Sequence, residues 1–378
     1  MVPPEADTRV ALIGFGYAGR VFHAPLIAAT PGLALAAIGS RQGSRVGSAY
    51  PGVDVIPDPL AAARHPDIDL VVIATPNDTH APLAETALRA GKHVVVDKPF
   101  TITLAEARAL AAIAGAAGRV LSVFQNRRWD SDFLGVAREL LAGRIGEILE
   151  LRSEMSRYRP QIRDRWRERA GPGAGIWYDL GPHLIDQALV LFGPPETVLA
   201  DLQIQRSGGA AVDWFEAILG YGRKRVILTS SMLAADSGRR FLVRGTSGSL
   251  LKRRGDPQEK QLVSGRTPGS PGWGSDPDPL LLIAGEAASP AEVAAPAGNY
   301  LGYYLALRDA LRGEAEPPVT PGQAATVMAI IEAGMRSAEE GRRVAPEYTD
   351  AERSAWRPGD APHQSRSPVA PDFGGRPS

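Results

Sequence analysis

Cysteine is absent from this chain of 378 residues. Its absence excludes disulfides, cysteine-ligated zinc, iron–sulfur clusters and thiol nucleophiles. The six histidines include no close pair at the spacing of metal ligands. We therefore predict no metal site in this protein.

Net charge is also lacking, because 42 lysines and arginines balance 42 aspartates and glutamates. Without a global field, the chain is not predicted to bind nucleic acid or an anionic membrane surface. No apolar run is long enough to span a bilayer, and the first residues lack the basic and apolar regions of a signal peptide. These absences predict a cytoplasmic protein.

Two domains are expected for a chain of this length. In its first third, short apolar runs alternate with helical or turn-rich sequence, which predicts a parallel, doubly wound Rossmann sheet in an α/β domain of residues 1–124. The predicted strands are 9–13, 33–38, 70–74, 93–97 and 120–124, with helices at 20–29, 81–90 and 104–117.

The pattern changes after residue 124. Longer runs of alternating polar and apolar residues predict a C-terminal α+β domain, residues 125–344, with a large, open, mostly antiparallel sheet. The runs are 148–158, 198–205, 213–221, 225–231 and 240–244, and two helices are predicted at 300–312 and 321–340. Residues 345–378 show no periodicity and are predicted to form a disordered tail.

A glycine-rich turn joins the first predicted strand to the first helix. Gly14 permits the tight turn, Gly16 lets the backbone approach a pyrophosphate, and Gly19 lets the helix pack on the strand. The helix N-terminus, with Tyr17 and Ala18, supplies N–H groups for the phosphate. This pattern predicts a dinucleotide cofactor.

The end of the second predicted strand favours NADP(H) over NAD(H). An NAD-binding fold places an acid there for the ribose hydroxyls, whereas this chain has Ser40 and Arg41. A hydroxyl and a guanidinium can bind a 2′-phosphate, which an aspartate would repel. The alternative is that Arg41 is a solvated loop residue, in which case NAD(H) serves as well.

Lys98 follows the predicted strand 93–97, at the sheet edge where ligands of such folds bind. From there a lysine can hydrogen-bond a substrate hydroxyl and favour its alkoxide-like state. Pro99, next in the chain, fixes the direction of the lysine if the peptide bond between them is cis.

A second cluster of chemically active residues follows a glycine-rich segment. Asp179 and His183 are four residues apart and would share one face of a helix. A histidine can accept a hydroxyl proton near neutral pH while a carboxylate orients it. Asp186 lies one turn beyond, so spacing leaves open which acid is the partner, or whether the pair is incidental.

Three motifs together resemble the glucose-fructose oxidoreductase/inositol dehydrogenase family (Gfo/Idh/MocA) over about residues 8–345. They are the glycine turn, the segment 75–80 with Asp97-Lys98-Pro99, and the segment 171–186. The resemblance implies that Lys98, Asp179 and His183 are the catalytic residues. The family's usual glutamate before the lysine is Asp97 here.

Segments 22–27 and 126–133 are similar to a bacterial subgroup that includes NADP-linked scyllo-inositol dehydrogenases. The resemblance implies a homodimer, or a dimer of dimers, formed through the open face of the C-terminal sheet. It also implies cofactor contacts beyond the glycine turn, Ser40, Arg41 and Lys98, namely Thr75, Pro76, Asn77, His80 and Pro99. The implied substrate contacts are Arg127, Trp129, Tyr158, Trp166, Tyr178, Asn299 and Tyr300.

The predicted function is NADP(H)-dependent hydride transfer to or from a secondary hydroxyl of a cyclitol or sugar, with scyllo-inositol as the leading substrate. The alternatives are a reductase of another ketosugar, a dihydrodiol or a tetrapyrrole, and a non-catalytic dinucleotide sensor. The arginine-rich stretch 157–169 disfavours a large apolar substrate and could bind a phosphorylated or carboxylated sugar. Most of its arginines are predicted to be solvated.

Overall fold

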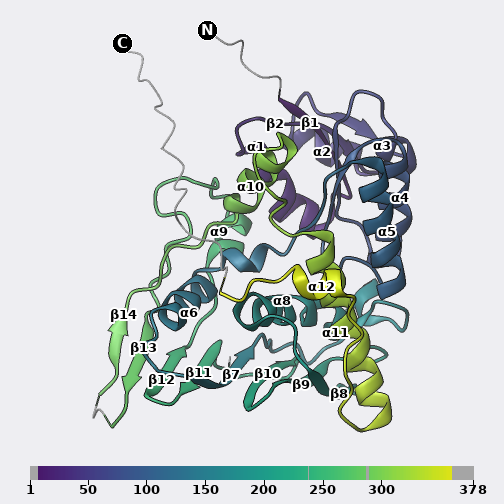
Figure 1. The fold of residues 1–378 in the computed structure, drawn as a ribbon. Coiled ribbons are helices and arrows are strands. Elements are labelled where there is room, and N and C mark those ends of the chain that lie inside the picture. Colours follow the sequence, from purple (N-terminus) through teal and green to yellow (C-terminus); the bar gives the residue numbers. More distant parts are fainter. Residues whose placement is uncertain (1–6, 237, 287–288, 360–378) are drawn as a thin grey trace, which may run out of the picture.

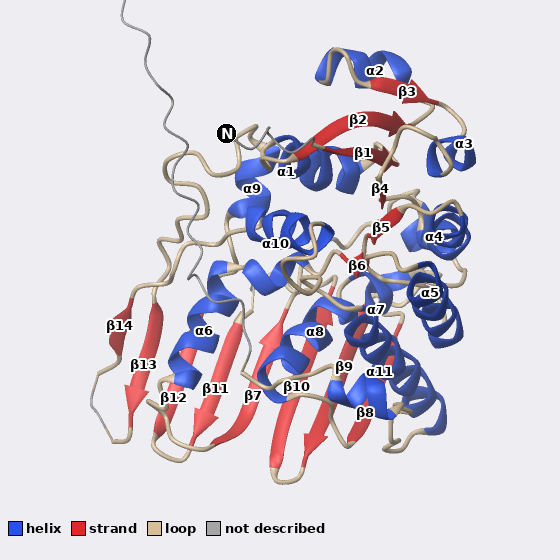
Figure 2. Ribbon diagram, turned by 45° about the horizontal axis from the view of Figure 1, so that its top comes forward, coloured by secondary structure: helices blue, strands red, loops and turns tan. Residues whose placement is uncertain are grey.

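The computed structural model describes residues 7–236, 238–286 and 289–359 (Figure 1). Its N-terminal sheet has six strands in the order β3-β2-β1-β4-β5-β6, which can be followed in Figure 2, and every pairing is parallel. This is the strand order of the Rossmann fold, which confirms the predicted fold class. The strands are β1 (Thr8–Ile13), β2 (Leu33–Gly39), β3 (Asp54–Ile56), β4 (Leu70–Ile73), β5 (His93–Val96) and β6 (Leu121–Val123).

Burial on both faces explains why these strands read as apolar runs. All four residues of β4 and the last four of β1 are buried, as expected for a parallel sheet covered on both sides. Thr103 and Glu106 form a capping box that starts the last of the covering helices, and Gly118 ends it. The helices here are α1 (Ala24–Ala28), α2 (Gly43–Ala49), α3 (Pro59–Ala63), α4 (His80–Arg89) and α5 (Leu104–Ala117), of which α2 and α3, with β3, were not predicted.

The C-terminal sheet has eight strands in the order β14-β13-β12-β11-β7-β10-β9-β8. Only the pair of β7 and β10 is parallel, so the predicted, mostly antiparallel sheet is confirmed. Strands β12 to β14 were not predicted. The strands are β7 (Ile148–Glu154), β8 (Thr197–Gln203), β9 (Trp214–Tyr221), β10 (Lys224–Ser231), β11 (Phe241–Gly245), β12 (Gly248–Lys252), β13 (Leu280–Ala284) and β14 (Ala291–Val293).

Helices lie on one face of this sheet, as Figure 2 shows. They include α6 (Ser131–Leu141), α8 (Gly181–Phe192) and α11 (Pro321–Glu340), while α10 (Leu301–Leu311) packs against the N-terminal domain at α1. Helix α11 contacts both β8 and α5, and so joins the two domains. No helix in the described part of the chain is long and apolar enough to cross a membrane.

The buried side chain of Trp177 anchors the short helix α7 (Gly175–Asp179), to which it belongs. This indole is 1% exposed and donates from Nε1 to the carbonyl of Ile331 (3.1 Å). Its ring packs against Gly181 and Gly334, where a Cβ would lie 3.1 and 2.4 Å from ring atoms. Since Asp179 is the last residue of α7, the indole fixes the position of that carboxylate.

The predicted disordered tail is wrong for residues 345–359. They carry a short helix, α12 (Asp350–Ser354), which begins with a capping box of Thr349 and Glu352. Glu352 is buried and pairs with Arg108 of α5 (2.8 Å), and Trp356 is 7% exposed. These anchors are isolated in the sequence and create no periodicity. Residues 360–378 lie outside the described residues.

Candidate active site

A cavity of about 720 Å³ lies between the two domains. It opens at the carboxyl ends of β1, β2, β4 and β5, where ligands of open α/β sheets bind. The C-terminal domain closes it with segments 157–167 and 179–183. Of the predicted site residues, the cavity is lined by Gly14, Gly16, Tyr17, Ala18, Ser40, Arg41, Thr75, Pro76, Lys98, Arg127, Trp166, Asp179 and His183.

The glycine turn has the geometry that a dinucleotide requires. Gly14 has φ of +101°, and a Cβ there would lie 2.5 Å from the carbonyl oxygen of Ala74, so no other residue fits. Gly19 packs against the carbonyl of Gly14, at the start of a π-helical turn, 19–23, that continues into α1. A Cβ at Gly16 would meet no atom within 4 Å, so its backbone is open for a phosphate to approach.

Ser40 and Arg41 stand at the end of β2, on the cavity wall. The Ser40 hydroxyl accepts a hydrogen bond from the backbone N–H of Gln42 (3.0 Å). Arg41 is exposed and forms no ion pair with any residue in the described ranges. A free guanidinium and a hydroxyl beside it can bind a phosphate.

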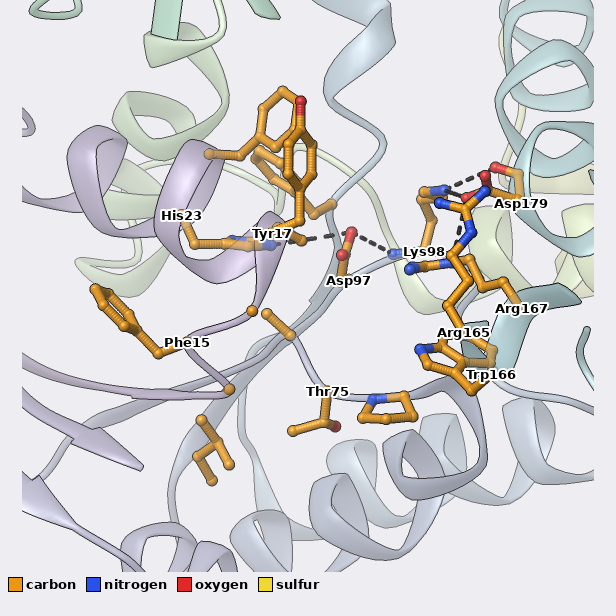
Figure 3. Close-up of a pocket in the computed structure, with 18 of the residues that line it drawn as sticks. Phe15, Tyr17, His23, Thr75, Asp97, Lys98, Arg165, Trp166, Arg167 and Asp179 are labelled. Carbon is orange, nitrogen blue, oxygen red and sulfur yellow. Dashed lines mark hydrogen bonds and ion pairs between the residues drawn. The ribbon is translucent and has the colours of Figure 1, made fainter. Parts of the chain in front are cut away.

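Lys98 and Asp179 meet across the domain boundary, as Figure 3 shows. The lysine Nζ donates to Asp179 Oδ1 (2.8 Å) and to the Asp179 backbone carbonyl (2.7 Å). Burial would raise the pKa of Asp179, but the positive charges of Lys98 and Arg167 hold it well below its ordinary range. The aspartate is therefore a carboxylate, and one of the three N–H groups of the lysine stays available to a ligand.

His183 lies in the first turn of α8 and lines the same cavity. Burial, reinforced by the charges of Lys98 and Arg127, holds its pKa well below the ordinary value of 6.5. The imidazole is therefore neutral at neutral pH and can accept a proton. Its Nδ1 is buried without a hydrogen-bond partner in the described structure.

Neither acid hydrogen-bonds His183 in the described structure. Asp179 ends α7 and pairs with Lys98, while both carboxylate oxygens of Asp186 accept from Arg128 (2.7 and 2.9 Å). The prediction that Asp179 orients the imidazole therefore has no direct hydrogen bond behind it in the described structure. Spacing within one helix could not reveal partners that come from other elements.

Asp97 fixes the backbone at Lys98, a role that the sequence did not suggest. Its Oδ1 accepts from the Lys98 N–H (2.8 Å) and lies 3.9 Å from His23 Nε2. Burial raises its pKa, but the nearby His23 and Lys98 bring it below its ordinary value. The ring of His23 is buried, with Nδ1 hydrogen-bonded to the hydroxyl of Tyr304 (2.6 Å). The bond between Lys98 and Pro99 is cis.

Helix α9 (Gln258–Val263) carries a further contact between the domains. Glu259 accepts from the Tyr17 hydroxyl of the glycine turn (2.8 Å) and pairs with Arg127 (3.2 Å). Arg127 also pairs with Asp130 (3.2 Å), so its charge is shared by two carboxylates before any ligand binds.

Several predicted contacts do not line the cavity. Asn77 and His80 are buried and bond to backbone carbonyls, the former to Gly173 and the latter to Pro99 and Thr75. The Tyr300 hydroxyl donates to Asp130, and that of Tyr178 to Ile102. The predicted residues outside the lining are Gly19, Asn77, His80, Pro99, Trp129, Tyr158, Tyr178, Asn299 and Tyr300.

Five arginines of the stretch 157–169 lie at the cavity, where Arg163 is exposed and the other four are half-buried. The five are Arg157, Arg159, Arg163, Arg165 and Arg167. The segment is irregular and ends in a 3-10 turn, Trp166–Glu168, and Trp166 lines the cavity together with its two arginine neighbours. No regular spacing in the sequence could therefore have identified these five arginines. No group of described residues has the composition and geometry of a metal site.

Two family models match this chain. The model of an oxidoreductase family's NAD-binding Rossmann fold matches residues 8–125, and the model of an oxidoreductase family's C-terminal alpha/beta domain matches residues 138–345.

Similar proteins come from several bacteria. The chain is 52% identical to the uncharacterized oxidoreductase YdgJ of Escherichia coli (strain K12), over 88% of this chain and 97% of that protein. It is 35% identical to scyllo-inositol 2-dehydrogenase (NADP(+)) IolW of Bacillus subtilis (strain 168), over 91% and 98%. A crystal structure from Klebsiella pneumoniae, provisionally assigned as an oxidoreductase, matches with a TM-score of 0.86 and 49% identity, over 92% and 97%.

Proposed function

Since the chain belongs to the Gfo/Idh/MocA family of oxidoreductases, we propose that it transfers hydride between NADP(H) and a secondary hydroxyl or ketone of a cyclitol or sugar. The observation that carries this proposal is the meeting of Lys98, Asp179 and His183 in one cavity with the glycine turn. A proton acceptor and a hydroxyl-binding cation beside a cofactor turn are what alcohol oxidation needs.

The cavity residues fit a nicotinamide dinucleotide. Gly14 and Gly16 would hold the pyrophosphate, because the turn is open at Gly16. Ser40 and Arg41 would hold the 2′-phosphate, and Thr75 and Pro76 line the path between these sites and Lys98. When bound, the nicotinamide accepts hydride in oxidation and gives it in reduction.

In the oxidation direction, the remaining N–H of Lys98 donates to the oxygen of the substrate hydroxyl and stabilises the developing alkoxide. The neutral imidazole of His183 takes the hydroxyl proton as the carbonyl forms. Asp179 is a positioning residue, because its carboxylate and carbonyl together fix the lysine ammonium. In reduction, protonated His183 returns the proton to the oxygen.

The substrate class rests on the relatives and on the polar lining of the cavity. One relative is named for scyllo-inositol and NADP(+), and another is named an inositol 2-dehydrogenase. Of the predicted substrate contacts, Arg127 and Trp166 line the cavity, and we propose only these two for the substrate. A homodimer, or a dimer of dimers, formed through the sheet face away from α6, α8 and α11, and a cytoplasmic location are also part of the proposal.

Initial rates test this proposal directly. Purified protein is assayed with NADP⁺ and, separately, NAD⁺ against inositol stereoisomers, neutral aldoses, sugar acids and sugar phosphates. An NADP⁺-linked rate with a polyol supports the function. Tight NADPH binding without turnover of any polyol or ketose contradicts it and favours the sensing role.

Replacing Arg41 with alanine tests the choice of cofactor. A charge-assisted contact with phosphate contributes about 1.5–3 kcal/mol, so we expect KM for NADP⁺ to rise at least about tenfold while KM for NAD⁺ changes little. Steady-state kinetics with both cofactors measures the ratio. Arg45 lies in α2, donates a hydrogen bond to the side chain of Gln42 and does not line the cavity, so Arg45→Ala is the control. An unchanged ratio in Arg41→Ala would remove this residue from the cofactor site.

The pH profile tests the role of His183. Because burial and the charges of Lys98 and Arg127 depress its pKa, the imidazole stays neutral as pH falls to its ordinary value of 6.5. We therefore expect kcat/KM for oxidation to lose activity on the acidic side only below pH 6.5, measured from pH 5 to 9. The limb should disappear in His183→Gln. An acidic limb centred at or above pH 6.5 that disappears in this variant would contradict the assignment.

A further inference from the structure

One wall of the cavity carries more positive charge than the proposed reaction uses. Arg157, Arg159, Arg163, Arg165 and Arg167 come from a single segment between β7 and α7. The side chains of Lys98 and Asp179 face this wall, and Figure 3 shows Arg165, Trp166 and Arg167 beside them.

The segment is fixed in place by backbone bonds and by a buried carboxylate. The N–H groups of Arg157 and Arg159 donate to the carbonyls of Ser231 (2.8 Å) and Met232 (2.7 Å). Glu168, 7% exposed, then pairs with Arg165 (2.7 Å) and with the buried Arg206 (3.0 Å). The wall therefore holds its shape before a ligand arrives.

Three of these guanidinium groups form no direct ion pair with a described residue. Arg165 pairs with Glu168, and Arg167 lies 3.6 Å from Asp179. The side chains of Arg157, Arg159 and Arg163 form no ion pair or hydrogen bond with any described residue. The carboxylates of the lining are Asp97, Asp179 and Glu259, and each already has a partner. A surplus of cations is thus left for a ligand.

Arg157 and Arg167 place part of this positive charge at the reacting end of the cavity. Burial raises the pKa of Asp179, while Lys98, Arg167 and Arg157 lower it, and Arg157 also contributes to the low pKa of His183. These guanidinium charges therefore act on the groups that we propose for proton transfer.

The 2′-phosphate of the cofactor does not account for this surplus. Arg41 follows β2 and Lys98 follows β5, and β1 and β4 lie between these two strands. Three strand spacings of about 4.8 Å separate the two positions by about 14 Å. An anion beside Lys98 is therefore a different one from a phosphate bound by Arg41.

We propose that the preferred substrate is a polyol that carries an oxyanion, as a carboxylate or a phosphate monoester, bound by Arg157, Arg159 and Arg163. The inference rests on the proposed function, whose hydride transfer at a secondary hydroxyl it keeps. Arginine forms paired, planar hydrogen bonds with both kinds of oxyanion, so the two share one recognition chemistry. Binding of the anion orients the hydroxyl toward Lys98 and His183.

Matched substrates test the proposal and separate the two sources of the oxyanion. Glucose, glucuronate and glucose 6-phosphate are compared with scyllo-inositol, myo-inositol and an inositol monophosphate in the NADP⁺-linked assay. We expect kcat/KM to be at least about tenfold higher for an acidic or phosphorylated compound than for its neutral counterpart, as one charged hydrogen bond provides. Equal or better turnover of the neutral compounds overturns the inference and leaves the proposed function standing.

Arginine variants then assign the contact. In Arg157→Gln and Arg159→Gln, the ratio of kcat/KM for the anionic over the neutral compound should fall about tenfold, with KM for NADP⁺ unchanged. Arg169→Gln is the control, because Arg169 belongs to the same segment but pairs with Asp164 and does not line the cavity. A rise in KM for NADP⁺ with an unchanged ratio would show that these arginines serve the cofactor and would overturn the assignment.

A binding measurement keeps the two proposals distinguishable. Glucuronate and glucose 6-phosphate are titrated calorimetrically into the complex of enzyme and NADPH, with wild-type protein and Arg157→Gln. Binding that the variant weakens, in a protein that oxidises no polyol, supports the anion site and contradicts the proposed function. Absence of binding together with absence of turnover contradicts both.

Discussion

Replacing Lys98 with alanine should lower kcat for polyol oxidation by about a thousandfold. We propose that the lysine holds the reacting oxygen, and Asp179 accepts two hydrogen bonds from its ammonium group. A preorganised donor at a developing oxyanion contributes about a hundred- to a thousandfold to the rate, and the carboxylate left behind adds to the loss by disturbing the site. Steady-state and single-turnover kinetics, with NADPH affinity measured by fluorescence titration, give the result.

Lys92 provides the matched control. It precedes β5, at the opposite end of the strand that Lys98 follows, and donates to the carbonyl of Pro66 (3.2 Å). Lys92→Ala should leave kcat within about twofold, because Lys92 does not line the cavity. A Lys98→Ala variant that loses NADPH affinity as strongly as kcat would contradict the catalytic role, as would one that retains full turnover.

Replacing Asp186 with alanine should lower the free energy of unfolding by about 3–5 kcal/mol. Arg128 and Asp186 are both buried, and the carboxylate accepts two hydrogen bonds from the guanidinium. Burial raises the pKa of Asp186 against the effect of Arg128, so the intact pair itself contributes little. The cost arises because the variant leaves the guanidinium buried without a carboxylate. Urea denaturation followed by circular dichroism measures it.

Asp179→Asn is the matched comparison for the second acid. Its side chain is 21% exposed at the cavity wall and its amide keeps the size of the carboxylate, so we expect a loss of unfolding free energy below about 1.5 kcal/mol. Turnover should fall at least about a hundredfold, because the lysine loses its charged partner. A large loss of turnover in Asp186→Ala, together with a large loss of unfolding free energy in Asp179→Asn, would contradict both assignments.

Much of the N-terminal domain was predictable, because its signals are local. The four buried residues of β4 form a continuous apolar run, and the positive φ of Gly14 requires a glycine directly after the first strand. Lys98 could be placed at the sheet edge for the same reason, since it follows an apolar run directly. Burial on both faces of a parallel sheet imposes such runs.

Prediction failed where the stabilising contact is distant or the element is short. Helix α12 is fixed by Glu352 on Arg108, 244 residues away, and the five residues of the helix are too few to show a period. Strand β14 has three residues, at the edge of its sheet. Tyr300 and Tyr178 are polar aromatic residues of the kind that line sugar sites. In the structure, however, their hydroxyls donate to the carboxylate of Asp130 and to the backbone carbonyl of Ile102 in the packed interior.

By itself, the sequence determined the parallel Rossmann sheet, the dinucleotide turn and which residue types are available for proton transfer, since backbone conformation and burial pattern depend on neighbours along the chain. Only the tertiary structure decided that Asp179 belongs to Lys98, 81 residues away, that Asp186 belongs to Arg128, and that Arg157 and its neighbours face the cavity. A charge is paired by whichever opposite charge the fold brings within about 3 Å, and that distance bears no relation to separation in the sequence.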